Sequence, residues 1–409
     1  MMMNSMKTAN FRSAIAGFAF LTSFALPSFA FAADSIKIVS SLPRTGSANA
    51  QTTSMVNGIK MAIAETNGKI GDTTISYEDW DDASAQKGNW DPTVEAQNAD
   101  KAIADEAVMA YVGTYNSGAA KISMPKLNAA GMVMVSPANT APNLTKAGFG
   151  EPNEPAVYRP SGKINYFRVV PTDDVQGAVA ADYAKELGAT KVFVLDDREV
   201  YGKGVAGVFQ KHAKEIGLEI VGTDGIDTKA SNYKSLMTKI KQTGADLVYF
   251  GGTTQTNAGQ IAKDMVAGGL KAKLIVPDGC YEKAFIEAAG AKALEDRCFI
   301  TFGGVAAKGL TGKGHDFYLA YLKTYTSEPE GYAVYGYEAA KVVISAMQRI
   351  HAAGGTITRA SVLAEVGKTK DYVGALGTWS FDANGDTTNR TMSVNTVRNG
   401  EFVMVKVVN

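Results

Sequence analysis

Short apolar runs alternate with longer amphipathic segments along most of the chain. Runs at 36–39, 108–112 and 247–250 are rich in β-branched or aromatic residues and have the length of buried strands. Between such runs, segments such as 53–66 and 175–187 carry apolar residues at helical spacing. This alternation predicts mostly parallel sheets with helices on both faces. The strand–helix units are too many for one open sheet, so we expect an α/β protein with two doubly wound lobes.

The pattern changes toward the end of the chain. After Gly304 helical periodicity dominates, and the tail then becomes strand-like at 393–397 and 402–408. Asn399-Gly400 between these two runs is a dipeptide typical of a tight hairpin turn. We therefore expect a helical region followed by a C-terminal β-hairpin.

The N-terminus has the parts of a secretory signal peptide. Lys7 and Arg12 precede a short apolar stretch at 14–26, and small residues follow it. The stretch is short for a membrane span. We therefore expect export of the chain and cleavage near Ala32 or Ala33.

Charge and residue usage argue against several kinds of site. The chain has 41 basic and 41 acidic residues, so it lacks the basic excess expected of a nucleic-acid-binding protein. His212, His315 and His351 lie far apart, and no metal-ligand spacing is present. We predict neither a metal nor a cofactor.

The two cysteines, Cys280 and Cys298, belong to a chain predicted to enter an oxidising compartment. A disulfide between them is the default prediction. The alternative is two buried thiols, because one cysteine follows a predicted strand and the other begins the next one. Those positions can be too far apart to bridge.

Polar and small residues follow the predicted strands at 108–112 and 133–135. In open α/β sheets, ligands bind beyond the carboxyl ends of the strands. Asn116 and Ser117 open a helix there, and a helix N-terminus can hold an anion. The segment 136–140 exposes backbone groups that could contact a ligand. The alternatives are a helix cap at Ser117 and a simple turn around Thr140.

A carboxylate follows the predicted strand at 274–276. Asp278 lies at its carboxyl end, where it could receive an ammonium group in a charge-assisted hydrogen bond. The alternative is a helix N-cap. A helix N-terminus for a carboxylate, opposite an acidic side chain for an amine, is what a zwitterionic amino acid requires. The side chain of such a ligand stays open.

The sequence resembles the type I periplasmic binding proteins of ABC transporters, in the branch that binds leucine, isoleucine and valine. The resemblance covers nearly the whole chain after the signal segment. Its most specific segments are 113–117, 136–145, 201–204, 249–252 and 277–279.

The resemblance implies which residues hold the ligand. In the first lobe, Ser117 and the segment with Ala138, Asn139 and Thr140 would hold the carboxylate and amine. Asn116 would lie beside them. Further contacts would come from Gln51, Tyr201, Thr253 and Asp278, with Asp278 on the ammonium. The family commonly has glutamate at the position of Asp278 and aromatic residues at those of Gln51 and Thr253, which leaves the preferred side chain open.

The resemblance also implies two Rossmann-like lobes joined by three crossovers. We expect a signal peptide at 1–33, a first lobe at 34–169 plus 304–389, and a second lobe at 170–303 plus 390–409. Such a protein would act in the periplasm as a monomer and deliver its solute to a membrane permease.

An enzyme is the weaker hypothesis. Gly202, Gly204 and Gly207 match the spacing of a dinucleotide fingerprint, but residues 196–201 separate them from the preceding strand. Two further alternatives stay open at this point. The same fold could bind an amide, a urea-like molecule or an aromatic acid, or it could serve as a sensory ligand-binding protein.

Overall fold

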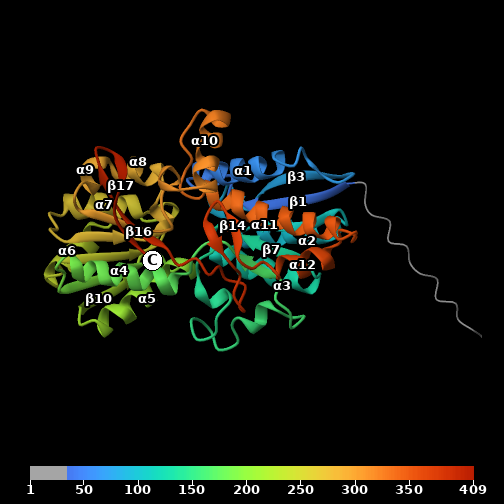
Figure 1. The fold of residues 1–409 in the computed structure, drawn as a ribbon. Coiled ribbons are helices and arrows are strands. Elements are labelled where there is room, and N and C mark those ends of the chain that lie inside the picture. Colours follow the sequence, from blue (N-terminus) through green and yellow to red (C-terminus); the bar gives the residue numbers. More distant parts are fainter. Residues whose placement is uncertain (1–34) are drawn as a thin grey trace, which may run out of the picture. The chain divides into compact units, whose positions relative to one another are not determined.

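The computed structural model describes residues 35–409. The predicted signal peptide and its cleavage site lie outside the described residues. The described chain contains two large sheets with helices packed against them (Figure 1). None of the described helices is both long enough and apolar enough to cross a membrane.

The first sheet has the strand order β2-β3-β1-β6-β7-β8 and is parallel except for the β2–β3 pair. Its strands are β1 (Ser35–Leu42), β2 (Lys69–Ile70), β3 (Thr73–Asp81), β6 (Val108–Gly113), β7 (Val133–Ser136) and β8 (Tyr166–Arg168). Its helices are α1 (Asn49–Ala64), α2 (Pro92–Ala104), α3 (Ser117–Ala129), α11 (Ala333–Ala352) and α12 (Arg359–Val366). α1 and α11 share one apolar cluster with the strands, and α2 and α3 share another. The sheet is therefore covered on both faces.

The second sheet has the order β10-β9-β11-β12-β13-β16-β17. Its strands are β9 (Lys191–Asp196), β10 (Glu219–Gly225), β11 (Leu247–Gly251), β12 (Lys273–Val276), β13 (Cys298–Gly303), β16 (Met392–Arg398) and β17 (Glu401–Val408). Its helices are α4 (Asp173–Glu186), α5 (Val200–Glu215), α6 (Lys234–Gln242), α7 (Ala258–Ala267), α8 (Lys283–Ala289) and α9 (Ala291–Leu294). In the predicted C-terminal hairpin, β16 pairs antiparallel with β17 and also with β13, which is far from it in sequence.

The chain passes between the two sheets after β8, after β13 and before β16. The stretch that returns from β13 contains α10 (Lys313–Tyr325) and a small hairpin of β14 (Tyr372–Gly374) and β15 (Gly377–Trp379). The predicted class, an α/β protein with two doubly wound lobes, is confirmed. The exact lobe boundaries at 169, 303 and 389 stay a prediction.

Two glycines allow α1 and α11 to pack closely. A Cβ atom at Gly58 would overlap the carbonyl oxygen of Ala333, and one at Gly336 would overlap that of Met55. The backbones of the two helices therefore touch, which larger residues would prevent. This contact joins a helix near the start of the chain to one near its end.

The predicted disulfide is wrong, because Cys280 and Cys298 are both free and buried. Cys298 begins β13 and pairs there with Leu274 of the parallel strand β12. Cys280 lies beyond the carboxyl end of β12, and the two thiols are therefore at opposite ends of neighbouring strands. The alternative of two buried thiols is the one that the structure has.

Candidate functional site

The carboxyl ends of strands from both sheets meet at one small cavity. From the first sheet come the residues after β6 and β7, and from the second those after β11 and β12. The lining consists of Tyr115, Asn116, Ser117, Ala138, Tyr201, Thr253, Asp278, Gly279 and Tyr332. Six of the predicted ligand contacts, Asn116, Ser117, Ala138, Tyr201, Thr253 and Asp278, are brought together here.

Asp278 is the charged group of this cavity and is fully buried. Both of its carboxylate oxygens accept tyrosine hydroxyls, one from Tyr201 and one from Tyr332. Gln176 adds a further hydrogen bond from its Nε2 to Oδ1, at 2.8 Å. Burial raises the pKa of Asp278, and these hydrogen bonds oppose the rise. No Lys, Arg or His is part of the cavity lining.

A second buried carboxylate lies behind the first. The Nε2 of Gln176 is 3.3 Å from Asp173 Oδ1, and its Oε1 accepts the backbone N–H of Asp278 at 2.9 Å. Burial raises the pKa of Asp173 well above its usual range, and the charge of Asp278 adds to the effect. Gln176 therefore connects two carboxylates whose ionised forms repel each other.

The first-sheet side of the cavity has short side chains and backbone. Ser117 is the first residue of α3, and its hydroxyl accepts the N–H of Ala141 at 3.4 Å. The Nδ2 of Asn116 is 3.5 Å from Gln255 Oε1, across the space between the two sheets. Within residues 35–409, the buried Tyr115 hydroxyl and Asn116 Oδ1 have no hydrogen-bond partner. They are polar groups that a ligand or water can satisfy.

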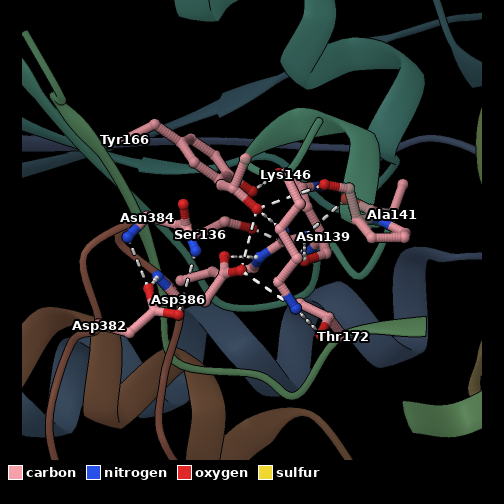
Figure 2. Close-up of polar contacts among 12 residues, drawn as sticks. Ser136, Asn139, Ala141, Lys146, Tyr166, Thr172, Asp382, Asn384 and Asp386 are labelled. Atoms are coloured by element: carbon pink, nitrogen blue, oxygen red, sulfur yellow. Dashed lines mark hydrogen bonds and ion pairs between the residues drawn. The ribbon is translucent and has the colours of Figure 1, made fainter. Parts of the chain in front are cut away.

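A polar network fixes the loop after β7 (Figure 2). At its centre is Arg168, which is fully buried and binds Asp386 Oδ1 through Nε at 2.6 Å. Its Nη1 donates to the carbonyls of Asn139 at 3.0 Å and Ala141 at 2.8 Å, and its Nη2 donates to the Thr145 hydroxyl. This network holds the loop that presents Ala138 to the cavity.

Three predicted contacts do not line the cavity. The side chain of Asn139 donates to the carbonyl of Tyr115 at 3.0 Å and accepts the hydroxyl of Tyr166 at 3.1 Å. The carbonyl of Thr140 accepts the N–H of Asp173 at 2.9 Å. Gln51 spans from the carbonyl of Tyr281 to the N–H of Tyr332, at 3.2 Å each. All three are buried and support the residues that form the cavity.

Sequence reasoning missed Tyr115, Gln176 and Tyr332. Tyr115 belongs to the same strand-end loop as Asn116, so the rule that found Asn116 applies to it as well. Tyr332 precedes α11 and Gln176 lies in α4, and neither follows a strand. The first crossing between the sheets, after β8, places Gln176 near Asp278, and the return after β13 places Tyr332 there. Within residues 35–409, no group of three His, Cys, Asp or Glu side chains is arranged to hold a metal ion.

Comparisons with known proteins show the family of this chain. A family model described as "Periplasmic binding protein" matches residues 35–401. The Leu/Ile/Val-binding protein homolog 2 of Brucella abortus (strain 2308) is 29% identical over 354 residues, which are 84% of this chain and 85% of that protein.

Solved structures give the same result. The branched-chain amino acid transporter substrate-binding protein LivJ of Streptococcus pneumoniae, in complex with isoleucine, is 26% identical with a TM-score of 0.78. The match covers 91% of this chain and 99% of that one. A solute-binding protein of an ABC transporter from R. palustris, in complex with benzoate, is 19% identical with a TM-score of 0.75 over 91% of this chain and 96% of that one. The latter likeness shows the fold alone.

These relatives are solute-binding proteins and not enzymes. The predicted family resemblance is confirmed, since the family model spans nearly all of the described residues. This chain is a member of the periplasmic binding protein family, of the substrate-binding type that serves ABC transporters.

Proposed function

We propose that this protein binds an amino acid with a small hydrophobic side chain in the cavity at Asp278 and delivers it to an ABC permease. The observation that carries the proposal is a buried carboxylate at the cavity with no basic side chain in the lining. A ligand with an ammonium group supplies the missing positive charge. An uncompensated buried charge is costly, so this pairing favours binding.

The opposite side of the cavity suits the ligand's carboxylate. Ser117 begins α3, and the partial positive charge of a helix N-terminus stabilises an anion. Tyr115 and Tyr332 contact each other edge to face, with 6.0 Å between ring centroids, and Ala138 is close by in the lining. This apolar surface suits an aliphatic side chain. Two relatives point the same way: one is named a Leu/Ile/Val-binding protein homolog, and the other, LivJ, was solved in complex with isoleucine.

An aromatic acid suits the cavity less well. Benzoate is the ligand of a structural neighbour, but it has a negative charge and no ammonium. Bound beside an ionised Asp278, it would have no cationic partner in the lining. An amide or urea-like ligand would likewise leave the carboxylate without a charge to neutralise it.

A ligand screen by thermal shift tests the proposal. The panel contains the amino acids, benzoate, 4-hydroxybenzoate, acetamide and urea. Because a ligand that binds only the folded state stabilises it, we expect leucine, isoleucine or valine to raise the melting temperature most. Stabilisation only by benzoates, amides or urea would overturn the amino-acid proposal and leave a transport role for another solute.

The remaining parts of the proposal concern the protein's location, oligomeric state and partner. The protein would act in the periplasm as a monomer, with a permease as partner. Size-exclusion chromatography with light scattering tests the monomer. Uptake of the labelled amino acid by cells, with and without the gene, separates a transport role from a purely sensory one.

A further inference from the structure

A second cavity adjoins the ligand cavity at its edge. The two share Asn116, Ser117, Tyr201 and Thr253 in their linings. The second one adds Trp90 from the side of the first sheet and Glu199 from the side of the second. The second cavity therefore continues the ligand cavity between the two sheets, toward the half-buried residues Trp90 and Glu199.

Trp90 lies directly against the start of α3. It belongs to a short hairpin of β4 (Ala83–Ser84) and β5 (Asn89–Trp90), which follows β3. A Cβ atom at Gly118 would be only 2.6 Å from Cζ2 of the Trp90 ring. Glycine at position 118 is thus what allows the indole to lie beside Ser117, one of the ligand-cavity residues.

The hairpin that presents Trp90 is held firmly to the first sheet. Asp91 donates its N–H to the carbonyl of Asp82 at 2.8 Å, and its carboxylate accepts the Ser84 hydroxyl at 3.0 Å. Asp91 also caps α2 by accepting the N–H of Thr93 at 2.9 Å. Trp90 is therefore a fixed wall and not a mobile lid.

Residues of the second sheet face this wall. Glu199 lines the second cavity together with Trp90. Burial raises the pKa of Glu199, and Lys87 and Trp90 of the hairpin oppose the rise. Tyr201, two residues further, donates its hydroxyl to Asp278. Separation of Glu199 from Trp90 would therefore also withdraw Tyr201 from the first-sheet side.

We propose that Trp90 forms the outer wall of the ligand site and sets the rate at which ligand leaves, an inference that rests on the proposed function. The second-sheet residues close against the indole and its removal opens an exit beside Ser117. The effect falls on the dissociation rate, because wall contacts act after the ligand has docked.

Intrinsic fluorescence gives a direct readout. Trp80 and Trp379 are buried at 8% and 2% exposure and line neither cavity, whereas Trp90 is half-buried. In the W80F/W379F protein, we expect leucine to change the emission of Trp90. We also expect Glu199→Ala to change this emission without any ligand. Emission that responds neither to that substitution nor to any ligand that stabilises the protein would overturn the proposal.

Stopped-flow displacement of labelled leucine by unlabelled ligand measures the dissociation rate. If the screen favours another amino acid, that one is the probe. We expect Trp90→Ala to speed dissociation by about tenfold or more, as for loss of a packed aromatic contact, and Trp90→Phe to have a smaller effect. The control Trp379→Phe should leave the rate unchanged.

Gly118→Ala tests the same wall while leaving Trp90 itself unsubstituted. Its methyl group displaces the ring, so we expect faster dissociation, as in Trp90→Ala. The matched control is Gly204→Ala in α5, where a Cβ meets nothing within 4 Å. Failure of the proposed function appears as wild-type protein that binds no amino acid. Wild-type binding with unchanged dissociation in Trp90→Ala and Gly118→Ala contradicts the role of Trp90 alone.

Discussion

The buried ion pair of Arg168 and Asp386 contrasts with the buried carboxylates Asp173 and Asp278. Arg168 has protein partners for each of its three nitrogens, and Asp386 accepts from Arg168 and from the Thr145 hydroxyl. Asp173 and Asp278 share Gln176, and no basic side chain in the described part of the chain is hydrogen-bonded to either of them.

We assign the Arg168–Asp386 pair to structural support and Asp278 to ligand binding. A buried charge that the protein itself neutralises holds loops in place, here those around Asn139, Ala141 and Asp386 (Figure 2). A buried charge at a cavity without a protein counter-charge is unfavourable until another molecule supplies one. We therefore expect substitutions in the first pair to reduce stability and substitutions at Asp278 to reduce affinity.

The largest expected effect is that of Arg168→Ala. It removes the buried guanidinium from Asp386 and leaves only the partly buried Lys146, whose Nζ is 3.6 Å from Asp386 Oδ2. We therefore expect a loss of about 3–5 kcal/mol in the free energy of unfolding, measured by urea denaturation. The control is Lys126→Ala, which removes the exposed ion pair with Asp100 and should cost at most about 1 kcal/mol. Equal losses in both variants would show that the buried pair has no special structural role.

Asp278→Ala should have its main effect on binding. We expect a loss of about 2–5 kcal/mol in the binding free energy of the amino acid, because its ammonium loses a buried charged partner. Isothermal titration calorimetry measures this loss, and urea denaturation should show no comparable loss of stability. Asp278→Asn is the matched control for shape. Retained affinity in both variants would contradict the assignment of the ammonium to Asp278.

Tyr332→Phe should weaken binding less. The hydroxyl donates to Asp278 and stabilises its ionised form, which is the form that an ammonium requires. We expect a loss of about 1.5 kcal/mol in binding free energy, typical of a hydrogen bond to a charged group. Tyr325→Phe, which removes a hydroxyl bonded to the carbonyl of Asn57 away from the cavity, serves as control. An unchanged affinity in the Tyr332→Phe variant would show that the Tyr332 hydroxyl does not contribute to ligand binding.

The smallest effect concerns pH. Burial raises the pKa of Asp278 in the ligand-free protein, and a bound ammonium would lower it again. Binding then releases a proton whenever Asp278 starts protonated, so affinity should fall as the pH drops through the raised pKa, above the ordinary aspartate range. Calorimetric titrations from acidic to neutral pH measure this fall. Asp278→Asn should lack this component of the pH dependence, and the same slope in that variant would assign it to another group.

Part of the site could be predicted from the rule that ligands bind beyond the carboxyl ends of strands in open α/β sheets. Ser117, Ala138 and Asp278 follow strands of parallel sheets, and such ends collect at one edge. Tyr332 and Gln176 are 54 and 102 residues from Asp278, respectively, and reach it through helices and crossovers that no local pattern specifies.

Local sequence also could not separate ligand contacts from supports. Asn139 and Thr140 follow β7 as Ala138 does, but their hydrogen bonds join the network of Arg168 and the N–H of Asp173. The mostly parallel sheets and their alternation with helices were predictable, because buried parallel strands and amphipathic helices leave clear patterns. The order of the strands within each sheet was not predicted. The prediction of a disulfide was wrong for a related reason. An oxidising compartment permits a disulfide but does not determine which end of a strand a cysteine occupies.

The most direct test of the central claim compares two ligands that differ only in the amino group. Calorimetry would measure wild-type binding of leucine and of 4-methylpentanoate, which is leucine without its amine; another favoured amino acid would be paired with its own des-amino acid. If Asp278 receives the ammonium, the amino acid binds and the des-amino acid does not bind measurably. Equal affinity for both ligands, or tighter binding of the des-amino acid, would contradict the claim that Asp278 receives the ammonium group.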